Sequence, residues 1–250
     1  MSTRSEREHV RVVADESALA EAVAEFVVER AGAAIAERGR FDLALAGGST
    51  PKAAYALLAA PPLRSRVTWE LVRFFFGDER CVPPTDDQSN YKMANDALLA
   101  PLGIAESAVF RMRGENEPHA AASAYADILR RELSAGGTPA FDAIMLGMGP
   151  DGHTASLFPG HDPFEDDGAL VRAPYVEKFA AHRITLTPQV LNAARCVAIA
   201  TSGTQKAAAL AAVLEGPRDP GKYPISVVAP VDGRLTWFVD RAAAAQLGGR

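Results

Sequence analysis

Cysteine is scarce in this chain: only Cys81 and Cys196 occur among 250 residues. The two form no close pair motif, so the pattern does not favour a disulfide scaffold, and a reducing compartment is expected. No apolar run approaches the roughly 20 residues that span a bilayer, and the polar stretch 1–10 lacks the apolar core of a signal peptide. We therefore expect a cytoplasmic protein without a membrane partner.

Positive charge is also in short supply. The chain has 26 Lys and Arg against 31 Asp and Glu, a formal net charge of −5. This balance argues against a general nucleic-acid binder, and any anionic ligand would have to be held by local positive groups. The composition is otherwise that of a globular protein. We expect one α/β domain over residues 1–250, with a flexible N-terminus over residues 1–8.

Short apolar runs alternate with alanine-rich helical stretches along the chain. Such alternation is typical of an open, mostly parallel sheet with helices on both faces. The predicted strands are 10–13, 41–46, 71–76, 141–146, 196–200 and 235–239, with shorter ones at 169–176 and 183–186. The predicted helices are 17–38, 51–58, 90–99, 117–134 and 204–214, and 241–247 is the last element. Residues 77–88 and 216–224 are predicted to be long loops.

The most informative stretch follows the apolar run 141–146, where glycines and a proline break regular structure around Asp151 and His153. Open α/β folds place their chemistry at the carboxyl ends of such strands. A histidine is the usual general base near neutral pH, and a nearby aspartate can fix its tautomer. A structural loop histidine that caps a helix near Thr154, or a metal ligand, are the alternatives. A metal would need a third ligand, and His161 belongs to a separate segment.

A second strand end, residues 45–52 (LAGGSTPK), has the features of an anion site. Two glycines turn the chain, and Ser49 or Thr50 is predicted to cap a helix that has Pro51 in its first turn. Free backbone N–H groups at such a helix start attract phosphate. An ordinary tight turn fits the same residues equally well. The pattern is neither a Walker motif nor GxGxxG, so it does not imply a nucleotide.

Charged side chains follow other predicted strands. Asp78, Glu79 and Arg80 come directly after the apolar run 71–76, where a solvated, salt-bridged loop is the alternative to a functional site. Lys206 falls in the first turn of a predicted helix, where a cation opposes the helix dipole unless an anion binds nearby. Arg183 opens a short strand. Taken singly, Lys206 and Arg183 are better explained as ordinary surface and strand-edge residues.

Two hydrolase classes lack support. No GxSxG elbow of the α/β-hydrolase type occurs, and neither cysteine has a histidine next to it in the sequence.

Six segments together resemble the 6-phosphogluconolactonase family. They are 45–55 (LAGGSTPKAAY), 76–83 (FGDERCVP), 89–94 (SNYKMA), 146–160 (LGMGPDGHTASLFPG), 183–195 (RITLTPQVLNAAR) and 202–210 (SGTQKAAAL). They follow the family's order and span most of the chain, and the string DGHTASLFPG is the specific part. The resemblance implies a Rossmann-like α/β sheet with a small additional sheet. It extends to a broader group of sugar-phosphate enzymes that includes glucosamine-6-phosphate deaminase.

The resemblance also implies roles. The reaction would be hydrolysis of 6-phospho-D-glucono-1,5-lactone to 6-phosphogluconate, with no cofactor or metal. His153 would activate water with the support of Asp151, and Arg80 would bind substrate or stabilise the transition state. Asp78 matches the position of the deaminases' proton-abstracting aspartate and is placed in the substrate site. The positions that match the sugar-phosphate contacts of the broader group are Gly48, Ser49, Thr50, Arg183 and Lys206.

Two other functions fit parts of the pattern. A deaminase would carry an acidic residue five positions after the motif histidine, where this chain has Phe158, and a tyrosine where it has Arg80. Phenylalanine cannot move a proton, so both differences favour the lactonase. A non-catalytic sugar-phosphate sensor should lack the acid–base pair of Asp151 and His153. We expect a small-molecule lactone as the ligand, and a monomer or weak homodimer.

Overall fold

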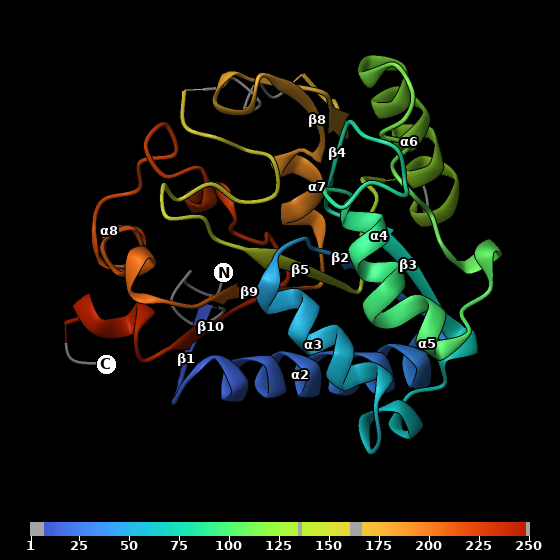
Figure 1. Ribbon diagram of the computed structural model, residues 1–250, viewed down its shortest axis with the longest axis horizontal. Coiled ribbons are helices and arrows are strands. Elements are labelled where there is room, and N and C mark those ends of the chain that lie inside the picture. The colour runs from blue at the N-terminus through green and yellow to red at the C-terminus, as the bar shows by residue number, and fades with distance from the viewer. Residues whose placement is uncertain (1–7, 135–136, 161–166, 249–250) are drawn as a thin grey trace.

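A six-stranded parallel sheet forms the centre of the computed structural model, which describes residues 8–134, 137–160 and 167–248. The strand order is β1-β10-β9-β5-β2-β3 (Figure 1). All six strands were predicted, with boundaries within two residues. Of the predicted flexible N-terminus, residues 1–7 lie outside the described residues, whereas Glu8 belongs to β1. The strands are β1 (Glu8–Val13), β2 (Phe41–Leu45), β3 (Val72–Phe76), β5 (Ala143–Gly147), β9 (Cys196–Thr201) and β10 (Arg234–Asp240).

The central strands are apolar because both of their faces are covered. Every residue of β2 is buried, and Leu43 lies opposite Phe74 of β3 and Ala143 of β5. A strand buried on both faces is expected to be a continuous apolar run rather than an alternating one. Phe41 and Trp237 are among the largest fully buried side chains, so the core extends across the sheet.

Helices cover the two faces in two groups. α3 links β2 to β3, which is the strand at one edge of the sheet. The connection from β5 to β9 and the connection from β9 to β10, which contains α8, run toward the other edge, formed by β1. Because such crossovers are right-handed, the two groups lie on opposite faces; Figure 1 shows α2 and α3 below the strands and α7 above. The helices are α2 (Glu16–Arg38), α3 (Ser49–Ala59), α4 (Asn90–Ala94), α5 (Ala100–Leu102), α6 (Pro118–Leu133), α7 (Pro188–Ala193) and α8 (Ala207–Glu215).

The direction of the connections reverses between β2 and β5, which are neighbours in the sheet. In open α/β sheets, a crevice forms outside the carboxyl ends of the strands at such a switch point, and ligands bind there. The two loops that flank this crevice are the glycine-rich segments that follow β2 and β5. The topology therefore brings together two segments that are about 100 residues apart in the sequence.

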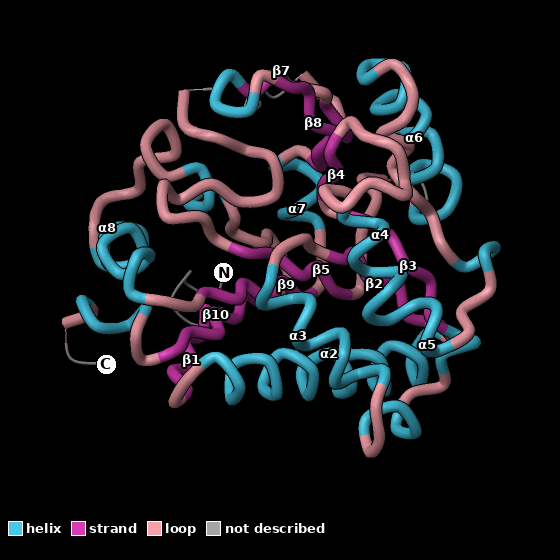
Figure 2. Tube along the Cα trace, viewed as in Figure 1, coloured by secondary structure: helices cyan, strands magenta, loops and turns pink. Residues whose placement is uncertain are grey.

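A small antiparallel sheet lies beside the main one (Figure 2). It contains β4 (Asp78–Arg80), β6 (Val171–Arg172), β7 (Tyr175–Val176) and β8 (Ala181–Leu186), with β8 pairing with each of the others. Gly77 alone separates β3 from β4. The Gly77 N–H donates to the Leu45 carbonyl at 2.9 Å, and its own carbonyl accepts the Leu186 N–H at 2.9 Å. One residue thus ties the two sheets together.

Several local predictions were wrong. The predicted loop 77–88 begins with strand β4, and the predicted strand 169–176 consists of two strands of two residues each. No helix starts near Thr154, which instead forms a tight turn with Leu157. The predicted helix 90–99 is helical throughout, and only its division into α4 and a following π-helical turn was not predicted. The six-residue α7 was missed because it is too short for helical periodicity; Pro188 at its start was the available signal.

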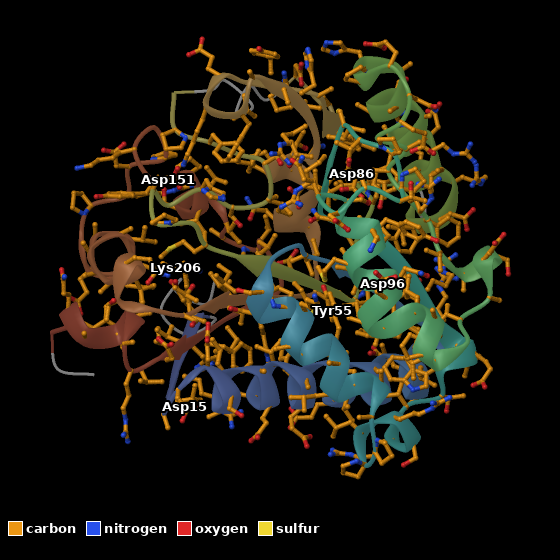
Figure 3. The ribbon with its side chains drawn as sticks, in the orientation of Figure 1. Asp15, Tyr55, Asp86, Asp96, Asp151 and Lys206 are labelled. Carbon is orange, nitrogen blue, oxygen red and sulfur yellow. The ribbon has the colours of Figure 1, made fainter. Side chains whose placement is uncertain are left out.

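Two fully buried tyrosines hold the ends of neighbouring strands. The hydroxyl of Tyr55, on α3 (Figure 3), accepts the Ala46 N–H and donates to the Ala46 carbonyl, both at 2.9 Å. The Tyr125 hydroxyl makes the same pair of bonds with Phe76. Burial raises the pKa of both phenols above the ordinary value, so the hydroxyls keep their protons. Each tyrosine therefore fixes the backbone at which a strand turns into a loop of the crevice.

We expect Tyr55→Phe to lower stability by about 1–3 kcal/mol, because it leaves buried backbone groups of Ala46 unpaired. For a chain of this size the melting temperature should fall by about 2–12 °C. Calorimetry measures this directly. Tyr91→Phe is the matched control, since no hydrogen bond in the described ranges uses its hydroxyl. Equal melting temperatures for the two variants would contradict the role given to Tyr55.

Candidate active site

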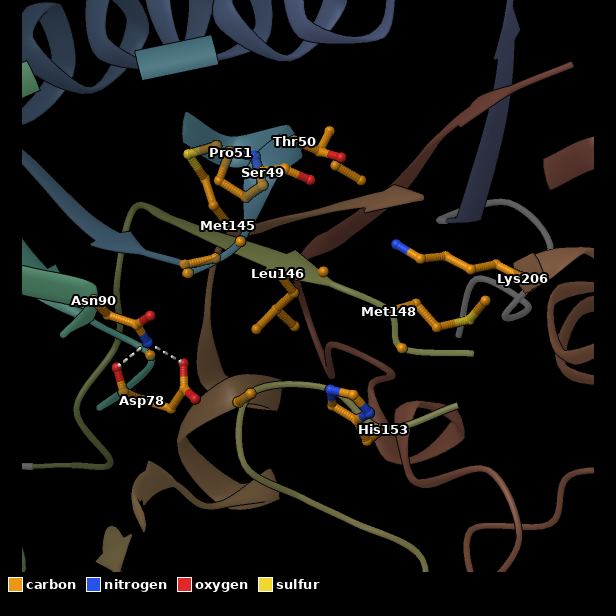
Figure 4. Close-up of a pocket in the computed structure, with 18 of the residues that line it drawn as sticks. Ser49, Thr50, Pro51, Asp78, Asn90, Met145, Leu146, Met148, His153 and Lys206 are labelled. Atoms are coloured by element: carbon orange, nitrogen blue, oxygen red, sulfur yellow. Dashed lines mark hydrogen bonds between the residues drawn. The ribbon is translucent and has the colours of Figure 1, made fainter. Parts of the chain in front are cut away.

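A cavity of about 250 Å³ lies at the carboxyl ends of β2, β3 and β5, at the switch point of the sheet (Figure 4). Most residues that the sequence singled out line it. Asp151 and Arg183 do not line the cavity and instead contact residues near it. The predicted residues that form its wall are Gly48, Ser49, Thr50, Asp78, Arg80, His153 and Lys206.

The start of α3 forms one wall. Gly48 is the N-cap residue, and its φ of +102° is accessible to glycine but strained for other residues. The predicted cap was wrong in detail, since Ser49 and Thr50 lie inside the helix and no side chain caps it. The first N–H groups of the helix are therefore left without a capping side chain, at its positive end. Such a helix start is suited to bind an anion.

Lys206 lines the cavity, and Figure 4 shows its side chain extending toward the middle of the cavity. It ends a short 3-10 turn after β9. Burial lowers its pKa below the ordinary 10.5, although the carboxylates of Asp240 and Glu16 partly oppose this effect. Within the described part of the chain, no carboxylate forms an ion pair with Lys206. A bound anion would supply the counter-charge.

His153 and Asp151 form a close pair at the opposite wall. The His153 Nδ1 lies 2.5 Å from Asp151 Oδ1, and Asp151 Oδ2 accepts a hydrogen bond from Lys178 Nζ at 3.1 Å. Burial opposes the charge of the Asp151 carboxylate, but the hydrogen bonds and charge from His153 and Lys178 outweigh it and lower the pKa to about 2. Because the carboxylate only accepts hydrogen bonds, Nδ1 carries a proton, which makes Nε2 the ring nitrogen that can accept one.

Glycine 149 allows this pair to form. A Cβ at this position would lie 2.1 Å from both Nδ1 and Cε1 of His153 and 2.8 Å from Asp151 Oδ1. The Gly149 N–H also donates to the His153 carbonyl at 2.9 Å, which closes the loop on itself. The glycine is therefore required by the close approach of the imidazole.

Phe158 packs on the imidazole. The rings of His153 and Phe158 are stacked with their centroids 4.4 Å apart, and Phe179 meets Phe158 edge-on at 5.7 Å. The Arg183 guanidinium lies 4.8 Å from the centre of the Phe179 ring. Burial and the neighbouring charge of Arg80 lower the pKa of Arg183. In this structure Arg183 thus ends a stack of side chains that supports His153.

The Asp-Glu-Arg segment divides into three different environments. Asp78 is buried, and its Oδ2 accepts the Ser156 hydroxyl at 2.7 Å while its Oδ1 accepts the Asn90 amide at 3.1 Å. These bonds tie β4 to the loop that carries His153. Figure 4 shows Asp78 and Asn90 across the cavity from Lys206.

Glu79 is structural. Its buried carboxylate accepts the backbone N–H groups of Asn90 and Tyr91 and the Ser89 hydroxyl, and so anchors the start of α4. Burial raises its pKa. Arg80 lines the cavity, and its Nη1 donates to the Gln88 carbonyl. The arginine is therefore held by the loop that follows β4.

Sequence reasoning missed Lys178 and Asn90. Asn90 follows the N-cap Ser89, and a serine directly before a predicted helix was an available signal. Nothing local marks Lys178, which reaches Asp151 only through the fold. Among the described residues, no three His, Cys, Asp or Glu side chains cluster as metal ligands; His161 lies outside the described residues. No helix in those ranges is long and apolar enough to cross a membrane.

Comparison with known proteins agrees with the resemblance noted in the sequence. The chain matches the family described as "Glucosamine-6-phosphate isomerases/6-phosphogluconolactonase" over residues 14–237. It is 40% identical over 200 residues to 6-phosphogluconolactonase of Treponema pallidum, covering 79% of this chain and 82% of that protein. It is 38% identical over 242 residues to the human 6-phosphogluconolactonase, covering 94% and 92% of the two chains.

A solved structure gives the same result. The chain superposes on the solved structure of 6-phosphogluconolactonase from Trypanosoma brucei with a TM-score of 0.84 at 29% identity. The match covers 96% of this chain and 99% of that one. The expected sheet and small additional sheet are thus confirmed. The chain belongs to the glucosamine-6-phosphate isomerase/6-phosphogluconolactonase family.

Proposed function

We propose that this protein hydrolyses 6-phospho-D-glucono-1,5-lactone to 6-phospho-D-gluconate in the oxidative pentose phosphate pathway. The observation that carries the proposal is that one cavity has an uncapped helix start and Lys206 on one side and His153 on the other. An anchor for phosphate and a base for water are the two parts that this reaction needs. The relatives named above bear the name of the same activity.

The phosphate would bind at the start of α3. The N–H groups and hydroxyls of Ser49 and Thr50 would donate to its oxygens, and Lys206 would supply the positive charge. Gly48 lets the phosphate approach the backbone closely. Arg183 remains a proposed contact that would have to turn away from Phe179 to reach a ligand in the cavity. Binding the remote end in this way would orient the lactone carbonyl toward His153.

His153 would act as the general base. Its Nε2 would accept a proton from water while the water oxygen forms a bond to the lactone carbon C1. The carbonyl oxygen would become an oxyanion, and Arg80 or loop N–H groups would stabilise it. The bond from C1 to the ring oxygen would then break, and His153 would return the proton to that oxygen. Asp151 would hold Nδ1–H in the correct orientation throughout.

Two other functions remain testable. A deaminase needs a group that moves protons while the sugar ring opens, and Phe158 offers only a stacked ring to His153. A sensor would bind sugar phosphate without turnover. The deciding experiment measures lactone hydrolysis above the spontaneous rate and ammonia release from glucosamine-6-phosphate with the same preparation. We expect only the first; ammonia release alone would establish the deaminase, and binding without either reaction would establish the sensor.

We expect Lys206→Met to raise KM at least tenfold with little change in kcat, if the lysine binds phosphate equally in the ground and transition states. Without ligand, the same variant should melt at a higher temperature than the wild type. Because burial lowers the pKa of Lys206, the charged lysine destabilises the folded state relative to the unfolded state at any pH at which the lysine is protonated. Steady-state kinetics and calorimetry measure the two effects. Lys222→Met, which removes an exposed lysine that does not line the cavity, should change neither. An unchanged KM in Lys206→Met would refute the assignment.

The remaining expectations concern the setting of the reaction. We propose a cytoplasmic enzyme that acts as a monomer or weak homodimer and has no nucleic-acid partner. Light scattering across a range of concentrations measures the oligomeric state.

A further inference from the structure

The Asp151 carboxylate contacts two basic side chains, His153 and Lys178. Its Oδ1 faces His153 Nδ1, and its Oδ2 accepts Lys178 Nζ at 3.1 Å. The side chain of Lys178 is 57% exposed and that of Asp151 30% exposed, so the pair lies at the rim of the site rather than in the core. Lys178 does not line the cavity. It therefore acts on the base only through Asp151 or through its charge.

The turn that carries Lys178 contacts the base on two sides. Lys178 belongs to a 3-10 turn, Glu177–Phe179, between β7 and β8. Its neighbour Phe179 packs on Phe158, which in turn stacks on His153. Ala180 ends the turn with a φ of +47°, a conformation that a residue with a side chain rarely adopts. The turn thus holds both Asp151 and the ring that covers the imidazole.

We propose that Lys178 is a positioning residue that orients Asp151 and keeps His153 in its neutral, proton-accepting form. The inference rests on the proposed function, in which His153 is the general base. A carboxylate alone beside an imidazole would favour the imidazolium, which cannot accept a proton. The Lys178 ammonium on the other oxygen opposes that effect, because two positive charges would then share one negative charge.

Other charged groups near the pair do not replace Lys178. Asp78, Arg80 and Lys206 line the cavity, but none forms an ion pair with Asp151 in the described part of the chain. Lys222 lies over the ring of Tyr223, which packs beside Gly152. Lys222 is thus an exposed lysine near the same loop that lacks the contact to Asp151, and it serves as the matched control.

The test is the pH dependence of kcat/KM for lactone hydrolysis, with spontaneous hydrolysis subtracted. In Lys178→Met the acid limb should move to higher pH by on the order of half a pH unit, since its midpoint reports protonation of the essential base. Lys178→Arg should restore the wild-type profile. Lys178→Gln, which keeps a donor for Asp151 but no charge, should retain the shift. The shift should shrink in 1 M NaCl, where exposed charges are screened.

Two further variants sharpen the result. In an Asp151→Asn background, Lys178→Met should no longer move the limb, because the shared carboxylate is gone. Lys222→Met should leave it in place. If Lys178→Met lowered kcat/KM by the same factor at every pH, its effect would be structural and the proposal would be overturned. If Lys222→Met shifted the acid limb as much as Lys178→Met, the effect would be a long-range effect of charge, which would also overturn the proposal.

Nuclear magnetic resonance separates failure of this inference from failure of the proposed function. The imidazole signal of His153, assigned by its loss in His153→Gln, can be titrated in the wild type and in Lys178→Met without substrate. We expect the variant imidazole to gain its proton at higher pH. If it does so while the wild type hydrolyses no lactone, the proposed function fails and the role of Lys178 stands. If the wild type is active and the two titrations coincide, the inference fails alone.

Discussion

Replacing His153 with alanine should lower kcat for lactone hydrolysis by about 10²–10⁴-fold, the range that a positioned general base contributes. KM should change by no more than a few-fold, because the proposed phosphate anchor lies on the other side of the cavity. Phe158 would lose the ring on which it stacks, but its contact with Phe179 remains. The measurement is steady-state hydrolysis above the spontaneous rate, with circular dichroism to verify the fold.

His119→Ala is the control, since this histidine lies beside His182 and away from the cavity. A near-wild-type kcat in His153→Ala would contradict the assignment of His153 as the base.

The pH profile adds a second check. The pKa of Asp151 is depressed to about 2, so the Asp151 carboxylate stays ionised throughout pH 5–8. The stability that this carboxylate contributes to the fold is lost only as the pH falls below the ordinary aspartate pKa of 3.8 toward 2. A loss of activity between pH 8 and 5 would therefore report protonation of another group, and we expect that group to be His153.

Gly149→Ala should reduce kcat nearly as much as His153→Ala, although it adds only one methyl group. The new Cβ would lie 2.1 Å from the His153 ring, so the imidazole must rotate out of its place beside Asp151. The obstacle is a side chain that can move rather than backbone, so we expect the fold to survive, with a fall in melting temperature of at most a few degrees.

A double variant tests whether the clash is the cause. In a His153→Ala background, Gly149→Ala should reduce kcat no further, because the side chain it displaces is absent. Gly32→Ala is a control for the change of residue type, since a Cβ there meets no atom within 4 Å. If Gly149→Ala kept wild-type kcat, the Asp151–His153 geometry would be unnecessary for turnover.

Local patterns predicted the parts of this protein that are local in origin. Continuous apolar runs marked the buried strands β2, β3 and β5, because parallel strands covered on both faces have no polar side. The glycines before Asp151 and His153 marked the loop that brings the two side chains together. The resemblance to known lactonases then supplied the substrate class, which no single loop could provide.

Features that depend on distant contacts were not predictable in the same way. β4 has three residues, two of them acidic, and exists because it pairs with β8 about 100 residues later. Lys178 reaches Asp151 across a separation of 27 residues with no repeating pattern between them. Ser49 and Thr50 have the residue types of helix caps, yet the turn at Gly48 places them inside the helix. In each case tertiary structure decided the outcome.

Gly77, the single residue between the two sheets, separates the residues proposed to bind the phosphate from those proposed to face the sugar ring, so the two sets could change independently. The loop after β2 and Lys206 after β9 form the proposed phosphate anchor, while β4 of the small sheet brings Asp78 and Arg80 to the cavity. Every lactone with the same phosphate would use the first set of contacts, whereas the residues of β4, together with His153, would face the ring that differs. An effort to accept a new ring stereochemistry would therefore do best to randomise the small sheet and leave the loop after β2 intact.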